Sequence, residues 1–236
     1  MMLSVCMATY NGEPFIVRQL DSVLKQLSPN DEVIIVDDGS KDRTIPLIKE
    51  TYGDRVQVYV NERNVGAIKS FEKAISLAKG DILFLCDQDD VWEDRKVSEI
   101  VRAFEDPGTT LVVHDASVVD GHLKVIDPSW NHYNANNINQ GIVGNIIKNA
   151  FTGAMMAIRK ELVSDILPFP PSIEMHDQWI ALVCMMKKQK ITYIDQPLMK
   201  YVRHGGNVTG MKKRSLSSQL KGRVKTLSAI TRYKFQ

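Results

Sequence analysis

The strongest constraint on the fold is a fourfold alternation of short, largely apolar segments with longer segments of helical periodicity. The segment at 82–86, Ile-Leu-Phe-Leu-Cys, is apolar at every position. Such a strand is stable only where both faces of its sheet are covered, as in parallel sheets with helices on both sides. We therefore predict an α/β fold with a mainly parallel, Rossmann-like sheet. The expected strands are 3–10, 32–36, 56–60 and 82–86, and the expected helices are 14–27, 43–52, 68–78 and 92–104.

A polar cluster follows three of these expected strands. In parallel α/β sheets the carboxyl ends of the strands share one edge, and ligands bind in the crevice there. The sequence therefore predicts that polar clusters far apart in the chain converge on a single site. The clusters are Thr9-Tyr10-Asn11, Asp37-Asp38 and Asp87-Gln88-Asp89-Asp90.

The third cluster places three carboxylates within four residues, which repel one another unless a cation or hydrogen-bond donors compensate them. Alternate residues leaving a strand direct Asp87 and Asp89 to one side. A small set of hard oxygen ligands suits Mg²⁺ or Mn²⁺ bound together with the phosphates of a substrate. The alternative is a solvated acidic turn, in which Asp90 caps the helix that follows.

The second cluster, Asp37-Asp38, has two interpretations that are compatible. One carboxylate can cap the next helix in an ordinary strand-to-helix turn. The other can accept a hydrogen bond from a ligand, for example from the N3–H group of a pyrimidine base. Two adjacent carboxylates can divide these roles.

Two candidates lie in the second half of the chain, and each has a structural alternative. Asp177 begins an expected helix over 176–188, where a carboxylate can simply cap backbone N–H groups. Beside it, Trp179 fits either a pocket wall or the core. His204 opens the loop His204-Gly205-Gly206-Asn207 and can complete a metal site or contact a phosphate, although a lone histidine is more often structural.

The rest of the second half is less regular. We expect strands over 110–119, 153–158 and 191–194, and a long Asn-rich loop over 127–141 that acts as a lid or faces an acceptor. An amphipathic helix is predicted over 214–233. Its apolar face consists of Leu216, Leu220, Val224, Leu227 and Ile230. Ten Lys or Arg and no Asp or Glu follow Asp195, so this basic tail either packs on the catalytic domain or lies on an anionic membrane.

Composition excludes several classes of function. A net charge of +2 over 236 residues gives no argument for nucleic acid. Three cysteines without C-x-x-C spacing, Cys6, Cys86 and Cys184, predict reduced, buried thiols in the cytosol. The start is not a secretory signal, and no apolar run approaches the length of about 18 residues that a membrane span needs. The lack of a phosphate loop or a G-x-G-x-x-G motif weighs against an NTPase and a nicotinamide dehydrogenase.

Together the motifs resemble those of the family 2 glycosyltransferases, which have the glycosyltransferase-A-type fold, and they follow the order of that family. The Asp-Gln-Asp-Asp-x-Trp and His-Asp-x-Trp variants are most similar to rhamnosyltransferase-like bacterial members that build surface polysaccharides. The sequence departs from the family at Ala8, where proline is common. The resemblance spans residues 3 to about 210 and is carried by 4–12, 36–40, 64–66, 84–92, 176–179 and 204–207.

The resemblance implies a role for each matching residue. Asp177 would be the general base of a one-step inverting transfer. Asp89 would bind Mn²⁺ or Mg²⁺, with Asp87 and His204 as further ligands. Asp38 would bind the pyrimidine base. The implied nucleotide-sugar-binding residues are Thr9, Tyr10, Asn11, Asp37, Asp38, Asn64, Lys69, Asp87 and Gln88.

The resemblance also implies an organisation and partners. A catalytic domain over 1–211 would comprise a nucleotide-binding half over about 1–105 and an acceptor half over about 106–211, followed by a basic segment over 212–236. The donor would be a UDP- or dTDP-sugar, with rhamnose as a candidate, and the acceptor a saccharide or a lipid-linked saccharide. The expected location is the cytoplasm, including the cytoplasmic face of the inner membrane. Two alternatives stay open, a sugar nucleotidyltransferase and a non-catalytic nucleotide-sugar-binding module. For the nucleotidyltransferase, Thr9-Tyr10-Asn11-Gly12 lacks the basic character expected of a loop that binds a triphosphate.

Overall fold

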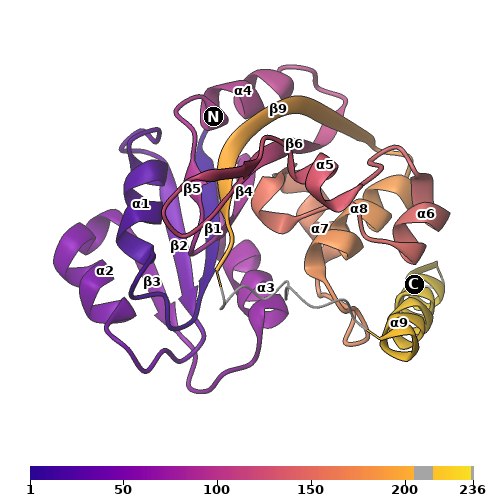
Figure 1. Cartoon of the computed structure of the whole chain (residues 1–236), viewed down its shortest axis with the longest axis horizontal. Helices are drawn as coiled ribbons and strands as arrows, with labels where there is room; N and C mark the ends of the chain where they lie inside the picture. Colours follow the sequence, from indigo (N-terminus) through magenta and orange to yellow (C-terminus); the bar gives the residue numbers. More distant parts are fainter. Residues whose placement is uncertain (205–214, 235–236) are drawn as a thin grey trace.

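The computed structural model describes residues 1–204 and 215–234, and one curled sheet runs through it (Figure 1). The strands are β1 Leu3–Thr9, β2 Glu32–Asp37, β3 Gln57–Val60, β4 Ile82–Asp87, β5 Val91–Trp92, β6 Thr109–Val119, β7 Val125–Asp127, β8 Met156–Arg159 and β9 Lys190–Val202. The helices are α1 Ile16–Leu24, α2 Thr44–Tyr52, α3 Ala67–Leu77, α4 Lys96–Ala103, α5 Trp130–Asn134, α6 Gly141–Ile147, α7 Val163–Ile166, α8 His176–Met186 and α9 Leu216–Lys234. Short 3₁₀ turns cover Gly53–Arg55, Gly153–Met155 and Lys160–Leu162.

The strand order is β3-β2-β1-β4-β8-β6-β9-β5, with β7 on the side of β6. The first four strands in this order are parallel, β8 is antiparallel to both β4 and β6, and β6 is parallel to β9. The prediction of an α/β fold with a mainly parallel sheet is therefore confirmed. The sheet is continuous from the first half of the chain into the second, because β4 and β6 both pair with β8.

Alternate residues of the central strands pack against opposite layers of helices. Val5 of β1 belongs to the core that contains Leu20 of α1, whereas its neighbour Cys6 belongs to the core that contains Phe71 of α3. Figure 1 shows α1 and α2 on one side of the sheet and α3 and α8 on the other. This double burial explains why the strands are apolar without alternation. The three cysteines are free and buried, as predicted.

Three predicted elements differ from the structure. The expected strand over 191–194 continues to Val202, because a register shift between His114 and Asp115 on β6 accommodates the proline-containing part of β9. The expected loop over 127–141 contains α5, which begins where Ser129 caps the His132 N–H group and Trp130 is buried. The expected helix over 92–104 begins only at Lys96, after the short strand β5.

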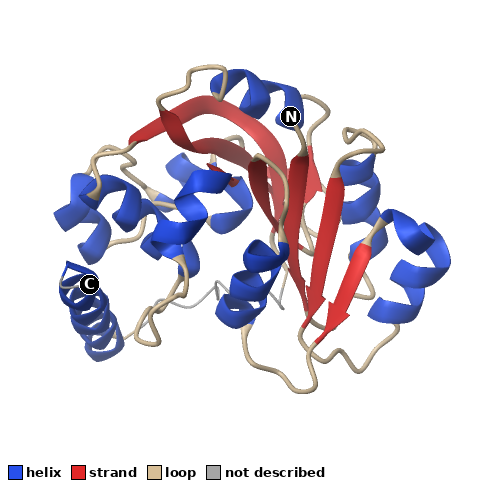
Figure 2. Cartoon of the chain, turned by 180° about the vertical axis from the view of Figure 1, so that it is seen from behind, coloured by secondary structure: helices blue, strands red, loops and turns tan. Residues whose placement is uncertain are grey.

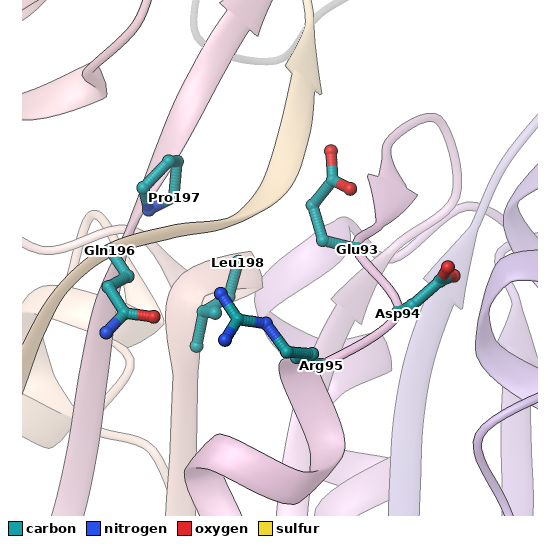
Figure 3. A pocket seen from close by; sticks show the side chains of 6 residues that line it. All are labelled: Glu93, Asp94, Arg95, Gln196, Pro197 and Leu198. Atoms are coloured by element: carbon teal, nitrogen blue, oxygen red, sulfur yellow. The ribbon is translucent and has the colours of Figure 1, made fainter.

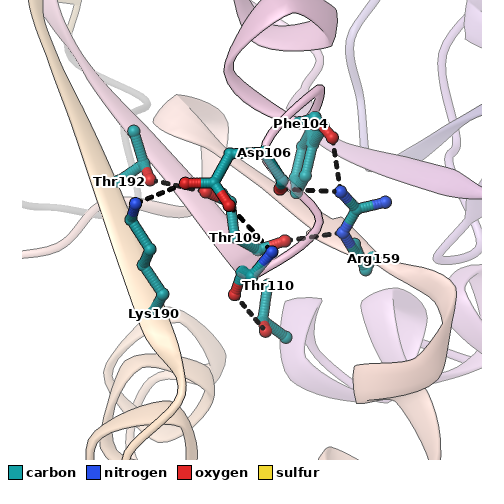
Figure 4. Close-up of polar contacts among 8 residues, drawn as sticks. Phe104, Asp106, Thr109, Thr110, Arg159, Lys190 and Thr192 are labelled. Atoms are coloured by element: carbon teal, nitrogen blue, oxygen red, sulfur yellow. Dashed lines mark hydrogen bonds and ion pairs between the residues drawn. The ribbon is translucent and has the colours of Figure 1, made fainter.

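A polar cluster ties the long strands together at the end remote from the carboxylates (Figure 4). The Arg159 guanidinium, at the end of β8, donates to the backbone carbonyls of Phe104, Asp106 and Thr109. The Thr109 and Thr192 hydroxyls lie 2.8 Å apart across β6 and β9. These contacts fix the starts of β6 and β9 relative to the end of β8, so the opposite edge of the sheet has a rigid support.

The helix α9 packs on the rest of the chain mainly through residues outside the predicted apolar face, of which only Ile230 is buried among the side chains that the structure describes. Its buried residues are Gly222, Thr226, Ala229 and Ile230, whereas Leu220, Val224 and Leu227 are 61%, 59% and 49% exposed. The Tyr233 ring meets the edge of the Trp179 ring, with centroids 5.4 Å apart. Within residues 1–204 and 215–234, none of the helices has the combination of length and apolarity that spanning a membrane requires.

Candidate active site

The sheet register brings the three polar clusters together. Thr9 of β1 pairs with Asp37 of β2, and Ala8 pairs with Asp87 of β4. The Asp38 N–H group also donates to the Thr9 carbonyl at 2.8 Å. The carboxyl ends of β1, β2 and β4 therefore form one edge, at which the clusters lie side by side as the sequence predicts.

The Gln88 side chain connects the ends of β1 and β4. Its Oε1 accepts from the Thr9 hydroxyl at 2.5 Å and from the Tyr10 N–H group at 2.8 Å, and its Nε2 donates to the Tyr10 carbonyl at 3.1 Å. Thr9 is buried, whereas the Tyr10 side chain is 43% exposed. Gln88 therefore holds the start of the first loop, and the Tyr10 ring is left available to a ligand at the edge.

The two carboxylates of the second cluster have different hydrogen-bond partners. Asp37 is fully buried, and its Oδ2 accepts from the backbone N–H groups of Gly39 and Ser40 at 3.1 and 2.9 Å. It stabilises the turn after β2, but it does not cap α2, because the N-cap position of that helix is Arg43 and has no side-chain cap. Asp38 accepts from the N–H groups of Val65 and Gly66 at 2.8 and 2.7 Å, which fixes the loop before α3.

Asp38 retains capacity for a ligand donor. Its Oδ1 accepts from Asn61 Nδ2 and the Val65 N–H group, but its only described donor to Oδ2 is the Gly66 N–H group. A carboxylate oxygen has two acceptor positions, so Oδ2 can accept one more hydrogen bond. This geometry is compatible with the predicted contact to a base.

The remaining predicted donor residues surround this loop. Asn11 has a positive φ of 49°, and its Oδ1 accepts from the Lys41 N–H group at 2.8 Å, which joins the loops after β1 and β2. Asn64 is exposed in the loop before α3, and a Cβ at Gly39 would lie 3.6 Å from its backbone nitrogen. Lys69 lies on α3, where its ammonium contacts both Glu72 carboxylate oxygens, at 2.9 and 3.0 Å.

Asp89 and Asp90, the two carboxylates shortly after β4, lie in different environments. Asp89 Oδ2 lies 2.7 Å from His204 Nε2, and the His204 ring stacks on Phe15 with centroids 4.3 Å apart. Asp90 is buried and accepts from the Val202 N–H group at 3.1 Å. The expectation that Asp90 caps a helix was therefore wrong, because the chain after it enters β5 and the Asp90 side chain anchors the end of β9 instead.

The electrostatics of this cluster oppose full ionisation. Burial, followed by the charges of Asp89 and Asp177, raises the pKa of Asp87 to about 7. Burial and the charges of Asp89 and Asp87 raise the pKa of Asp90 well above its ordinary value, and Asp90 Oδ2 has no hydrogen-bond partner within the described part of the chain. A cation placed at Asp87 and Asp89 would relieve this repulsion, so the donor set fits a hard divalent ion.

Two side chains already in contact, Asp89 and His204, could each supply one ligand to such an ion. Sites for Mg²⁺ commonly use one or two carboxylates and leave the other positions to water and substrate phosphates. Across residues 1–204 and 215–234 there is no preformed group of three His, Cys, Asp or Glu side chains suited to a metal. The residues Gly205, Gly206 and Asn207 of the predicted loop lie outside the described residues.

Asp177 is held at the same edge by residues of the second half. It is the second residue of α8 and 3% exposed, and its carboxylate accepts from Asn149 Nδ2 at 2.9 Å and from the Gly153 N–H group at 3.2 Å. Burial raises the pKa of Asp177, although the neighbouring His176 and these hydrogen bonds act in the opposite direction. The N-cap position of α8 is Met175, but Asp177 Oδ1 also accepts from the Gln178 N–H group at 2.6 Å, so the carboxylate satisfies a backbone donor of the first turn, as the structural alternative expects. Trp179 belongs to the core.

One residue of this region, Lys96, was missed by sequence reasoning. Its side chain is fully buried, and its ammonium donates to the Ala154 carbonyl at 2.7 Å and lies 4.3 Å from the Trp92 ring centroid. Burial lowers the pKa of Lys96 to about 8, although Asp90 and Asp87 act in the opposite direction. The available signal was its spacing: Lys96 precedes Ile100 by four residues and therefore lies on the inward face of the helix.

Helix α1 supports the main chain of the carboxylate cluster from one side. Gln19 is buried and donates to the Asp87 carbonyl at 3.1 Å, and Arg18 donates to the Asp89 carbonyl at 3.1 Å. The Ser22 hydroxyl accepts from the Trp92 N–H group at 2.9 Å. The segment from Asp87 to Trp92 is thus fixed by neighbours on one helix, as a preorganised site requires.

Two pockets of about 470 Å³ each lie apart from the carboxylate cluster. Figure 3 shows the first, which is lined by Glu93, Asp94, Arg95, Gln196, Pro197 and Leu198 and includes no predicted site residue. The second contains Lys69 of the predicted donor site together with Leu167 and Pro168. The first pocket carries no argument for the chemistry, which is concentrated at the carboxyl ends of the strands.

Solved structures support the fold. The Staphylococcus aureus protein TarS, crystallised as residues 1–349 with UDP-GlcNAc, matches 97% of this chain and 67% of its own, with a TM-score of 0.71 at 20% identity. The mannosyltransferase PcManGT of Pyrobaculum calidifontis, in complex with GDP-Man and Mn²⁺, matches 98% of this chain and 62% of its own, with a TM-score of 0.66 at 20% identity. At this identity the likeness establishes a shared architecture.

Sequence comparison gives the family. An uncharacterized glycosyltransferase of Nostoc sp. is 26% identical over 88% of this chain and 66% of its own length. The UDP-Glc:alpha-D-GlcNAc-diphosphoundecaprenol beta-1,3-glucosyltransferase WfgD of Escherichia coli is 33% identical over 41% of this chain and 38% of its own. The chain thus spans between 38% and 66% of these two curated relatives. Residues 4–167 match the model of the glycosyl transferase family 2, and the chain belongs to this family.

Proposed function

We propose that this chain is an inverting glycosyltransferase that moves a sugar from a nucleoside-diphosphate sugar to a saccharide or lipid-linked acceptor in bacterial surface polysaccharide synthesis. The observation that carries the proposal is the position of Asp177. Its buried carboxylate, presented by α8, is close enough to Asp87 at the end of β4 for its charge to raise the pKa of Asp87. In this proposal Asp177 is the base, and it faces the donor-side carboxylate Asp87 across the edge where Asp38 can accept from a nucleotide base.

In this proposal the two halves of the catalytic domain supply different groups. Residues 1 to about 105 provide the nucleotide site, with Asp38 at the base and Thr9, Tyr10 and Asn11 along the pocket. Residues from about 106 to 211 provide the acceptor side, and the segment over 212–236 follows them. WfgD, which resembles this chain, has a name that describes UDP-glucose and a diphosphoundecaprenol-linked acceptor, which supports the choice of a lipid-linked acceptor.

The proposed reaction assigns a role to each carboxylate. An acceptor hydroxyl attacks the anomeric carbon opposite the nucleoside diphosphate, and Asp177 takes up its proton. The raised pKa of Asp177 favours this role, because a more basic carboxylate is a better proton acceptor. The Asn149 and Gly153 hydrogen bonds hold the carboxylate in one orientation. A Mn²⁺ or Mg²⁺ ion bound by Asp89, with Asp87 and His204, would neutralise charge on the departing diphosphate.

Calorimetry tests the donor half of the proposal. UDP, dTDP and GDP are titrated into the chain with and without Mn²⁺, and one uridine or thymidine nucleotide is expected to bind more tightly with the ion. Asp89→Ala should remove that difference. Asp94→Ala is the matched control, because its carboxylate is 83% exposed and paired with Lys25 away from the cluster. Equal nucleotide affinity in wild type with and without Mn²⁺ would refute the metal assignment.

A panel of nucleotide sugars then tests the specificity. dTDP-rhamnose and UDP-hexoses are incubated with the chain, and nucleoside diphosphate release is measured. Release from dTDP-rhamnose alone would support the rhamnosyltransferase assignment that the Asp-Gln-Asp-Asp-x-Trp variant favours. Release from UDP-hexoses alone would reject rhamnose and keep the transfer reaction.

A further inference from the structure

The unexpected orientation of α9 leaves an apolar stripe on the surface. Leu220, Val224 and Leu227 are spaced by four and three residues, so they form one row along the helix. All three are about half exposed or more, at 61%, 59% and 49%. The opposite face of α9 is buried through small residues, so the row does not contribute to the core.

Helix α6, which packs against α9, also has exposed apolar residues. Its Val143 and Ile147 are spaced by four residues and are 71% and 54% exposed. The two helices are in contact, and the Arg223 Nε–H group donates to the Ile147 carbonyl at 3.1 Å. We define the α6–α9 surface as Val143, Ile147, Leu220, Val224 and Leu227.

Basic residues lie on both sides of the apolar row of α9, although one of them, Lys225, also lies 4.0 Å from the Glu174 carboxylate. With 100° per residue, Lys221, Lys225 and Arg232 lie on one side of the row in α9, and Arg223 lies on the other. Over Leu216–Lys234 the sequence contains no Asp or Glu. An apolar row between basic flanks is the pattern of a helix that lies in the interface of an anionic membrane.

We propose that the α6–α9 surface docks on an anionic lipid bilayer, with α9 parallel to the membrane and its apolar row among the acyl chains. The charge of α9 selects this occupant. Pairing of the surface with a second copy about a two-fold axis would bring the same basic flanks together, which is unfavourable. Negative phospholipid headgroups complement both flanks, at about 1 kcal/mol for each Lys or Arg near the surface.

The placement of α9 suits the proposed function. The link between docking and a membrane-bound acceptor rests on that proposed function. In Figures 1 and 2, α9 and the carboxyl ends of β1 and β2 lie toward the same lower side of the molecule. We therefore place the bilayer against the lower side of the molecule, near both α9 and the candidate site. A lipid-linked acceptor would be presented on that side.

Vesicle sedimentation of the full chain tests the docking directly. Wild type is expected to sediment with vesicles of phosphatidylcholine and phosphatidylglycerol and to remain in solution with phosphatidylcholine alone, and added salt should weaken the binding. The triple variant Leu220→Ser, Val224→Ser, Leu227→Ser should lose binding by about tenfold or more, because it removes the inserted apolar groups. Charge reversal at Lys221 and Arg232 should lower binding by a similar factor.

A matched control is the pair Val125→Ser and Ile126→Ser, which removes exposed apolar groups on β7 and should bind vesicles as wild type does. Equal binding by wild type and the triple serine variant would overturn the proposal. So would a wild-type dimer in sedimentation velocity that the triple variant converts to a monomer, because a second copy would then cover the surface. Nucleotide binding by the triple variant should match wild type, so failure of docking is distinguishable from failure of the proposed function.

Discussion

Replacement of Gly153 by alanine probes the connection between the acceptor side and the proposed base. A Cβ at this position would lie 2.6 Å from His176 Nε2, which is closer than a real Cβ contact. The His176 ring has little freedom to move, because it is buried and stacks on Phe71 with centroids 4.2 Å apart. Overpacking of this kind costs about 1–3 kcal/mol of the free energy of unfolding.

The expected loss is measurable both as stability and as rate. For a chain of this size, about 1–3 kcal/mol corresponds to a melting temperature lower by roughly 3–10 °C. Gly153 also donates its N–H group to Asp177, so displacement of the turn should lower kcat by about tenfold to a hundredfold. Nucleotide affinity should remain, because the donor residues lie on β1, β2 and β4.

Thermal unfolding and steady-state kinetics check this prediction. Gly121→Ala is the matched control, since a Cβ there meets no atom within 4 Å, and its melting temperature should stay within a few degrees of wild type. Combining Gly153→Ala with His176→Ala should recover part of the lost stability, because the clash is removed. A Gly153→Ala variant that melts and turns over like Gly121→Ala would refute the reasoning.

Two further predictions concern the buried charges. Lys96→Met should lower the free energy of unfolding by about 2–4 kcal/mol in urea titrations, because it leaves the Ala154 carbonyl without its donor and removes a positive charge near two carboxylates. The control Lys200→Met, at a surface pair with Glu93, should cost at most about 1 kcal/mol. Equal losses for the two variants would contradict the stabilising role of the buried Lys96 ammonium. The pKa of Asp87 is raised to about 7, above its unfolded value, so its ionisation should reduce stability as pH rises from about 4 to about 7. Mn²⁺ binding needs the ionised Asp87 carboxylate, so the affinity for Mn²⁺ should increase as pH rises through the upper part of that range. A calorimetric Mn²⁺ affinity that stays constant from about pH 6 to about pH 8 would argue against Asp87 as a ligand.

The sequence predicted the part of the fold that short-range pattern determines. Strands buried on both faces, such as Ile82–Asp87, are apolar without alternation, and this alone indicates a parallel sheet. The convergence of Thr9, Asp37 and Asp87 then follows from topology. The partners of single side chains did not follow: Asp90 anchors Val202, and Lys96 binds the carbonyl of Ala154, far away in the sequence.

The orientation of α9 shows a second limit of pattern. Periodicity identified Leu220, Val224 and Leu227 as one face, but it cannot distinguish a face buried in the protein from one that serves a membrane or partner. In the structure α9 packs closely through small residues, and a side chain at Gly222 would meet the Glu174 carboxylate. Such packing of a helix against a side chain from another segment is decided by tertiary contacts, which no local pattern contains.

Nucleoside diphosphate release by wild type and Asp177→Asn tests the proposed reaction most directly. The asparagine preserves the size of the side chain and can still accept the Gly153 hydrogen bond, but its NH2 group cannot accept from Asn149 and Gln178, and the side chain cannot take up the proton of the acceptor hydroxyl. With a donor that wild type uses, the variant is expected to lose about a hundredfold or more of its acceptor-dependent rate and to bind nucleotide as tightly as wild type. Release by Asp177→Asn at the wild-type rate would contradict the assignment of Asp177 as the base and, with it, the mechanism.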